Sequence, residues 1–173
     1  LIMAGCTLAS EARCAYPPGA SLDDVRQCIA KAPQAHPRLL VAPSDLEALR
    51  ESLAADPFRR ALADGVVKQA ELLRDAAPVA RKLQGRRLLG VSRTCVKRVL
   101  TLAMAWHLSG DRRHVDRCKQ EMVAAARFSD WNPSHFLDVA EMTFALAVGY
   151  DWLYGQLDDE SRAEIRDAIV HKG

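Results

Sequence analysis

The sequence predicts an all-α fold, and three observations support this prediction. Hydrophobic residues make up 49% of the 173 residues, enough for one medium-sized globular domain or part of a larger one. Helix start and stop signals recur from residue 44 to residue 172, and no alternating strand pattern interrupts them. The expected helices alternate between apolar and charged, which indicates antiparallel hairpins with covered inner helices. Inner and outer layers favour an (α/α) barrel or a curved helical solenoid over a flat bundle.

Residues 1–35 are predicted to lie outside the helical domain. They are rich in Ala, Pro and Ser, and a short helix is expected over residues 22–31. Residues 1–6 (LIMAGC) are typical of the end of a bacterial secretion signal, and a lipoprotein cleavage site would place a lipid anchor on Cys6. We therefore interpret residues 1–35 as a secretion-signal remnant and linker. Because the chain starts at Leu1 and stops at the end of a helix, we interpret it as a fragment.

Two helices are predicted after an extended lead-in at residues 36–41, where the residue before Pro37 is disfavoured in the helical region. Residues 44–47 (SDLE) form a capping-box pattern, with the serine as N-cap and the glutamate at N3. This helix should reach about residue 55. Asp56 then acts as the next N-cap, with a proline at the first helical position, and a second helix should continue to about residue 76.

An apolar helix and a charged helix are predicted next. After a basic connector, Ser92 is expected to cap a helix that runs to about residue 108 and is uncharged over residues 99–106. Gly110 ends it, and Asp111 starts a helix to about residue 128 that is charged on most of its surface. The connector is basic because of Arg81, Lys82, Arg86 and Arg87.

The second apolar helix follows the polar and aromatic segment 130–135 and is the centre of the prediction. Asn132 is expected to be its N-cap with Pro133 at the first helical position, and the helix should run to about residue 154. A helix that is apolar all round is normally buried all round, so its few charged residues need an explanation. These residues are Asp138, Glu141 and Asp151. A final charged helix is predicted to begin at Asp158.

Residues at the starts of the two apolar helices are candidates for ligand binding, because a curved double layer places these starts on a common rim. Trp131 and Phe136 offer flat apolar faces of the kind on which sugar rings stack. Asn132 and His135 can form hydrogen bonds, and a guanidinium can pair with an anion in a bidentate way. The candidate substrate-binding residues are Arg93, Trp131, Asn132, His135, Phe136 and Glu141.

Several of these polar and aromatic residues also have a structural interpretation. Asn132 can be only a cap, Trp131 can be part of the core, and His135 can bind nearby backbone. Asp138 and Glu141 can be partners of buried arginines or of helix N-termini, because a buried carboxylate needs a partner.

Composition argues against several classes of function. The net charge is only +2, which gives little support to nucleic-acid binding, and no apolar run is long enough to span a membrane. The five cysteines lack metal-type spacing, and Cys95 and Cys118 fall inside helices, where buried free thiols are expected. The histidines outside the rim show no ligand spacing, so we predict no metal and no cofactor here. They are His36, His107, His114 and His171.

Four motifs together resemble the N-terminal part of the heparinase II/III-like polysaccharide lyases. They are HPRLL at 36–40, LLGVSR at 88–93, DWNPSHFLD at 130–138 and GYDWLY at 149–154. The resemblance implies that residues 36–173 are the N-terminal part of an (α/α) toroid whose following β-sandwich region is absent from this sequence. It also implies an exported bacterial enzyme, periplasmic or associated with the outer membrane, acting on heparin-like glycosaminoglycans or alginate.

The family's reaction is β-elimination at a uronic acid, in which a group neutralises the sugar carboxylate while a base and an acid move protons. The resemblance places the family's catalytic Asn or His and Tyr beyond residue 173, and its zinc site in the β region. Only binding roles are therefore carried over, and this chain alone is expected to be inactive. Two alternatives remain: a glycoside hydrolase using Asp138 and Glu141 as its carboxylate pair, and a non-catalytic helical-repeat binding module.

Overall fold

The computed structural model describes residue 19 and residues 21–173, and within them the chain is all-α, as the sequence predicts. The described residues contain no strand, and their single isolated β-bridge joins Gln84 to Arg87. The proposed secretion signal and the Cys6 anchor lie outside the described residues. The helices are α1 (Leu22–Lys31), α2 (Pro43–Ala55), α3 (Pro57–Leu73), α4 (Leu89–Ser109), α5 (Arg112–Ala126), α6 (Phe136–Trp152), the 3-10 turn η1 (Tyr154–Gln156) and α7 (Asp159–Lys172).

The chain divides into two units, residues 1–33 and residues 34–173, two residues earlier than the boundary we predicted. In the first unit, the short helix predicted over residues 22–31 is present as α1 and begins at a capping box. The Ser21 hydroxyl accepts a hydrogen bond from the Asp24 backbone N–H, and the Asp24 carboxylate accepts one from the Ser21 N–H. Because α1 buries none of its residues, its capping box is the interaction that defines it.

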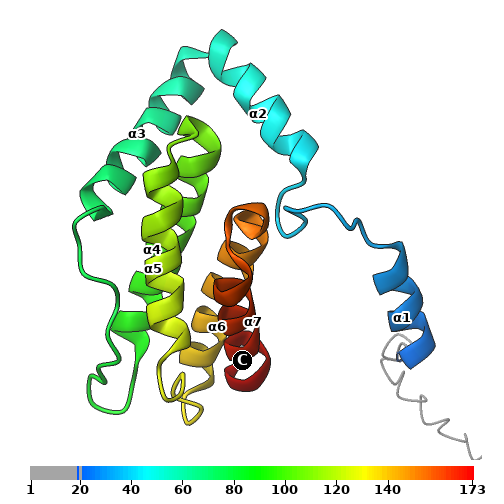
Figure 1. Ribbon diagram of the computed structural model, residues 1–173, viewed down its shortest axis with the longest axis vertical. Helices are drawn as coiled ribbons and strands as arrows, with labels where there is room; N and C mark the ends of the chain where they lie inside the picture. The colour runs from blue at the N-terminus through cyan, green and yellow to red at the C-terminus, as the bar shows by residue number, and fades with distance from the viewer. Residues whose placement is uncertain (1–18, 20) are drawn as a thin grey trace, which may run out of the picture. The chain divides into compact units, whose positions relative to one another are not determined.

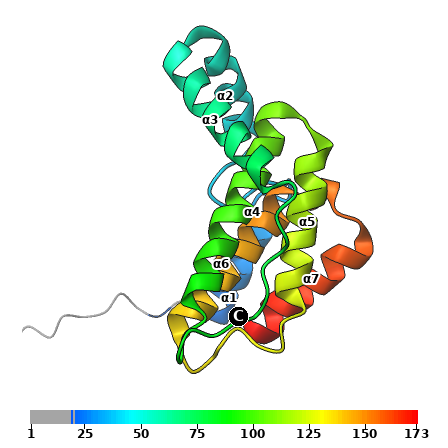
Figure 2. The same ribbon diagram turned by 90° about the vertical axis from the view of Figure 1, so that its left-hand side faces the viewer.

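In the second unit, α4 with α5 and α6 with α7 form two antiparallel hairpins (Figure 1). Figure 2 shows α4 and α6 together in one layer and α5 and α7 together in another. Helices α2 and α3 meet at Asp56 and diverge from there (Figure 1), and α3 packs on α4 and α5. The apolar helices thus lie side by side and the charged helices back them on one side, in agreement with the alternation in the sequence.

At Gly149, α6 packs tightly against α4 and α5. A Cβ atom at this position would lie 2.4 Å from Val99 Cγ1 of α4 and 2.6 Å from Met122 Sδ of α5. Those distances are well below van der Waals contact, so only a glycine lets the backbone of α6 approach both neighbours this closely.

The three helix starts predicted at aspartates are confirmed, and the three predicted at Ser44, Ser92 and Asn132 are wrong. Asp56, Asp111 and Asp158 accept backbone hydrogen bonds at the starts of α3, α5 and α7. In contrast, α2 begins at Pro43 with Ala42 as N-cap, and the Asp45 carboxylate accepts the Ala42 N–H at 2.8 Å. The predicted pair Ser44 and Glu47 does not form this cap, because the helix starts two residues earlier, at a proline that has no N–H to be satisfied.

The start of α4 is also earlier than predicted. The helix begins at Leu89, and Ser92 is buried in its first turn, where its hydroxyl donates to the Leu89 carbonyl and to the Glu141 carboxylate of α6. Ser92 is therefore a contact between the inner helices rather than a cap.

Two buried thiols in the helices are confirmed. Cys95 and Cys118 are free and buried, and burial raises the pKa of Cys95 to about 12, so the thiol is protonated at neutral pH.

Among the described residues, no helix combines the length and the apolar character that crossing a membrane requires.

A buried charge network attaches the connector between α3 and α4 to α5. The Glu121 carboxylate is completely buried and accepts hydrogen bonds from Arg117 at 2.6 Å, Arg98 at 3.2 Å and the Val79 backbone N–H at 3.1 Å. Arg117 also donates to the Leu73 carbonyl at the end of α3. Because every charge in this network has a partner of opposite sign, the network can be buried, and it fixes the connector that leads to the start of α4.

Candidate functional site

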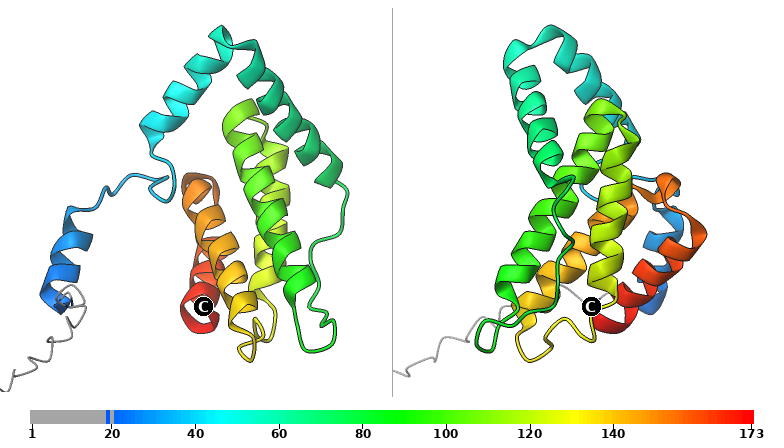
Figure 3. Two further views of the ribbon diagram at one scale, coloured as in Figure 1. Left: turned by 180° about the vertical axis from the view of Figure 1, so that it is seen from behind. Right: turned by 60° about the vertical axis from the view of Figure 1, so that its left-hand side comes forward.

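The candidate site is the rim, which we define as the N-terminal ends of α4 and α6 with the loops that precede them. Figures 1 and 3 show both loops at the same end of the two parallel helices. All six candidate substrate-binding residues lie on or next to this rim. The structure places them in four different environments: the buried interior, open solvent, a rim pocket and a groove.

Asp138, in the first turn of α6, holds the rim together. Its carboxylate is buried and accepts hydrogen bonds from the Leu88 backbone N–H and from the Asn132 side-chain amide, both at 2.7 Å. Leu88 is the N-cap residue of α4, so an acid on α6 supplies the cap that α4 lacks within its own sequence. The structural interpretation of Asp138 as the partner of a helix N-terminus is confirmed.

The environment of Asp138 keeps its carboxylate ionised. Burial alone would raise its pKa, but the hydrogen bonds from Asn132 and Leu88, together with the nearby His135 imidazole, hold the pKa below its usual value. His135 Nδ1 lies 3.2 Å from the Asp138 carboxylate. The rim therefore contains a fixed negative charge that is buried below its surface.

The sequence predicted Asn132 as the N-cap of α6, and this prediction is wrong. Its backbone is in the left-handed region at φ 60°, and His135 occupies the N-cap position. The Asn132 side chain donates to the Arg86 carbonyl at 3.0 Å and to Asp138, and it accepts from the Ser134 hydroxyl at 3.0 Å. With these bonds formed, the amide connects the two rim loops and is not free to contact a ligand.

Trp131 does not fit the stacking role predicted for it. The residue is only 1% exposed, and its indole N–H donates to the Ala125 carbonyl at 3.1 Å. Neither ring face is open to solvent, because the indole packs into the core beneath the loop. Trp131 is therefore part of the core, which was its structural interpretation.

Phe136, in contrast, is 81% exposed at the first position of α6. A large aromatic ring in this setting gains little from burial within the described chain. It is the aromatic residue of the predicted pair that presents its ring to solvent.

His135 lines a pocket of about 210 Å³ in the rim together with Arg86, Arg87 and Ser134. Within the described part of the chain, neither guanidinium takes part in an ion pair or a side-chain hydrogen bond. Each carries a full positive charge and can bind an anion through two parallel N–H donors. The pocket thus combines two available cations with an imidazole and a hydroxyl.

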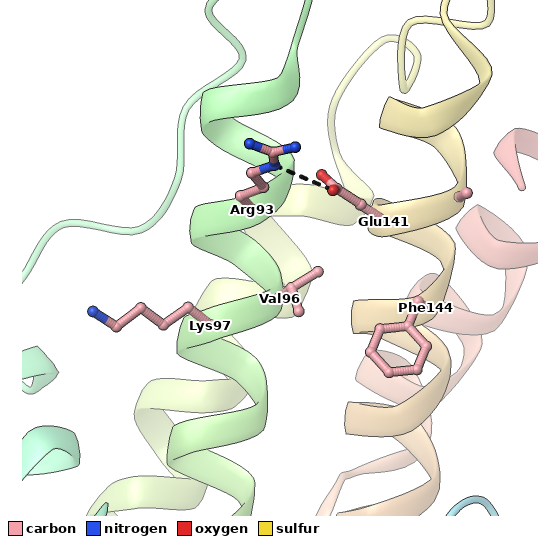
Figure 4. A pocket seen from close by; sticks show the side chains of 6 residues that line it. Arg93, Val96, Lys97, Glu141 and Phe144 are labelled. Carbon is pink, nitrogen blue, oxygen red and sulfur yellow. Dashed lines mark hydrogen bonds and ion pairs between the residues drawn. The ribbon is translucent and has the colours of Figure 1, made fainter.

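A shallow groove of about 350 Å³ lies between α4 and α6 near the rim, lined by Arg93, Val96, Lys97, Ala140, Glu141 and Phe144. Figure 4 shows Arg93 turned toward Glu141, with their atoms 3.4 Å apart, and the Lys97 amine pointing away from α6. Glu141 also accepts a hydrogen bond from Ser92 at 2.6 Å. The groove is mainly apolar on its walls, with one acid and one base at its upper end.

Arg86, Arg87 and Ser134 are functional candidates that sequence reasoning missed. The basic connector at residues 81–87 contains both arginines, but nothing in the sequence places this connector at the rim. Its relevance became visible only when Asn132, donating to the Arg86 carbonyl, placed the connector next to the start of α6.

The comparisons with known proteins leave the family open. A scan of the sequence against protein-family models gave no match, and a search of curated proteins gave no significant match. The resemblance to the heparinase II/III-like lyases therefore rests on the four sequence motifs and remains a prediction.

Proposed function

We propose that residues 36–173 form the N-terminal part of an (α/α) toroid in an exported bacterial polysaccharide lyase and bind an acidic polysaccharide at the rim. The substrate class is a uronic-acid-containing chain, such as heparin, a heparan-like chain or alginate. Two parallel apolar helices backed by two charged helices provide the double layer that a toroid wall requires, and this layering supports the proposal. The four motifs that resemble the lyase family supply the reaction class.

The observation that carries the proposal is the pair of unpaired guanidiniums at Arg86 and Arg87 beside His135. Elsewhere in the unit, buried arginines such as Arg117 are neutralised by carboxylates. Two cations held next to each other without a counter-ion favour an anionic ligand. A uronate carboxylate matches the bidentate geometry of a guanidinium.

The adjacent surfaces suit the rest of a sugar chain. The exposed ring of Phe136 offers a flat apolar face, and the Arg93–Glu141 pair lies at the rim end of the groove between α4 and α6. Neutralising the uronate carboxylate would make the C5 proton more acidic, which is the first requirement of β-elimination. The base and the acid of that reaction are assigned to parts of the toroid that follow residue 173.

The glycoside-hydrolase alternative loses its main support. Such an enzyme needs two carboxylates facing one cleft on either side of the scissile bond. Asp138 is instead buried and bonded to Leu88 and Asn132, and only Glu141 reaches the groove. The helical-repeat binding module remains the second candidate, because unpaired cations on a helical surface would also suit an acidic protein ligand.

The test is direct binding of heparin and alginate to the full 173-residue chain by calorimetry, with wild type compared with the double variant Arg86→Gln/Arg87→Gln. Loss of both charges should weaken binding at least about tenfold, which corresponds to about 1.4 kcal/mol. The affinity should also fall as salt concentration rises, since the contacts are exposed.

The matched control is Arg59→Gln/Arg166→Gln, which removes two exposed arginines away from the rim. Its net charge equals that of the rim double variant. It should bind like wild type. If both double variants weaken binding equally, attraction is by overall charge and the rim site is wrong. An acidic peptide that binds more tightly than either polysaccharide would favour the binding-module candidate.

A second measurement tests the assignment of catalysis to the missing part. The chain incubated with heparin or alginate should release no product that absorbs in the ultraviolet, because elimination would leave a conjugated double bond. Release of such a product would place the catalytic groups within these 173 residues.

A further inference from the structure

A second cluster of chemistry-bearing side chains lies at the α3–α5 junction, near the end of α4 opposite the rim. Glu71 comes from the last turns of α3, Asp111 is the N-cap of α5, and His114 is in the first turn of α5. One ligand atom from each of the three residues can be chosen so that all lie within 4.8 Å of one another. An imidazole and two carboxylates from two helices thus converge on one point.

The independent observation is the state of His114. Its side chain is only 1% exposed, and within the described residues neither ring nitrogen has a hydrogen-bond partner. Buried polar groups are almost always satisfied, so an orphaned imidazole needs a partner that the protein itself does not supply. Glu71 Oε1 lies 3.6 Å from Nε2, beyond hydrogen-bond distance.

That 3.6 Å separation fits two ligands of one metal ion. With metal–ligand bonds of about 2.1 Å on each side, it corresponds to a ligand–metal–ligand angle of about 120°, close to tetrahedral values. Neutral imidazole nitrogen and carboxylate oxygen are common zinc ligands, whereas Mg²⁺ and Ca²⁺ favour all-oxygen sites. The donor set therefore favours a borderline-soft divalent cation.

The Arg113 guanidinium pairs with both carboxylates of this cluster. It forms a bidentate pair with Asp111, with a shortest distance of 2.5 Å, and lies 3.7 Å from Glu71. The Arg113 side chain is 57% exposed and is attached through a long flexible stem. It can therefore move into solvent without disturbing the core, while the Asp111 cap to the Arg113 backbone N–H stays in place.

We propose that Glu71, Asp111 and His114 form a Zn²⁺ site that clamps the end of α3 to the start of α5, with Arg113 occupying the anionic cluster when the metal is absent. Glu71 and Asp111 are partly exposed, so the ion can enter from solvent and complete its coordination with water. We predicted no metal from the sequence, since His114 lacks ligand spacing to any other histidine. The third ligand lies 40 residues upstream, and only the α3–α5 packing brings it close.

The experiment titrates ZnCl₂ into the chelator-treated 173-residue chain by calorimetry and follows thermal unfolding in parallel. Binding should be one to one, and zinc at about 100 times its Kd should raise Tm by roughly 5 °C or more. Glu71→Gln should weaken binding tenfold or more. Arg113→Gln should tighten it, because the competing cation is gone.

Two controls separate this site from general zinc binding. Glu47→Gln and Arg166→Gln remove an exposed acid and an exposed base elsewhere, and neither should alter the affinity. Cobalt substitution tests the ligand type, because an exposed thiol such as Cys28 would give a thiolate charge-transfer band that nitrogen and oxygen ligands do not.

The direct test of the histidine ligand is His114→Gln, which should also weaken zinc binding. If that variant does not fold, Glu71→Gln and Arg113→Gln still test the proposal, because they should change the zinc affinity in opposite directions. Binding that is unchanged in both Glu71→Gln and Arg113→Gln would overturn the proposal. Absence of stoichiometric binding, or a cobalt spectrum with a thiolate band, would overturn it as well.

Discussion

The two ends of α6 carry the same kind of buried aspartate anchor in different surroundings. At the N-terminal end, the buried carboxylate of Asp138 accepts the Leu88 backbone N–H and lies beside His135. At the C-terminal end, the buried carboxylate of Asp151 accepts the backbone N–H groups of Arg38 and Leu39, both at 2.8 Å. In both cases an aspartate on an apolar helix anchors a loop that is distant in the sequence.

The difference lies in what surrounds each anchor. At the C-terminal end, His36 bonds to Asp151 at 2.6 Å and stacks on Tyr154 with ring centroids 3.9 Å apart, and the Trp152 indole donates to the Leu39 carbonyl. At the N-terminal end, the anchored loops present unpaired arginines and an exposed phenylalanine. The buried aspartates are therefore structural at both ends, and the unpaired surface charges mark the candidate site.

The largest expected effect is removal of either anchor. Asp138→Ala and Asp151→Ala each leave buried donors without an acceptor, so each should lower the free energy of unfolding by about 3 kcal/mol. Urea denaturation measures the change. If the comparison holds, only Asp138→Ala should also weaken polysaccharide binding, measured under conditions where both variants remain folded.

Asparagine variants at the same positions provide the control, because Asp138→Asn and Asp151→Asn retain one oxygen acceptor and most of the side-chain volume. They should cost less than the alanine variants. Equal losses in both series would mean that the charge, rather than the accepted hydrogen bonds, stabilises each anchor.

An intermediate effect is expected at Gly149, near the C-terminal end, where α6 packs tightly against α4 and α5. Gly149→Ala should destabilise the chain by about 1–3 kcal/mol, because the added Cβ would overlap Val99 and Met122. Gly155→Ala is the matched control, since no atom lies within 4 Å of the corresponding Cβ position. If Gly149→Ala left the free energy of unfolding unchanged, α6 and its neighbours would be able to move apart at little cost.

The smallest expected effect is on pH dependence at the N-terminal end. Because the folded-state pKa of Asp138 lies below its unfolded value of about 3.9, its contribution is present above that pH and is lost as pH falls through the folded pKa. The stability difference between wild type and Asp138→Asn should be constant from pH 7 to about pH 5 and shrink below about pH 4. A difference that grows on acidification would contradict a lowered pKa.

Local sequence signals predicted the helices well, because caps and breakers act through neighbouring residues. Asp56, Asp111 and Asp158 start their helices as expected, since each side chain reaches backbone N–H groups two or three residues away. The prediction was wrong at the starts of α2, α4 and α6, and at α4 the hydrogen-bond acceptor comes from another helix. The N-terminus of α4 is satisfied by Asp138, 50 residues further along the chain, and no local pattern records such a contact.

The sequence by itself determined the helical class, the alternation of apolar and charged helices and most helix boundaries, since these depend on composition and short-range hydrogen bonding. Tertiary structure alone decided which polar residues are buried anchors and which face solvent. It buried Trp131 and exposed Phe136, although both are aromatic residues of one short segment. It also left Arg86 and Arg87 unpaired beside His135, because a charge is neutralised only by groups that packing brings within a few ångströms.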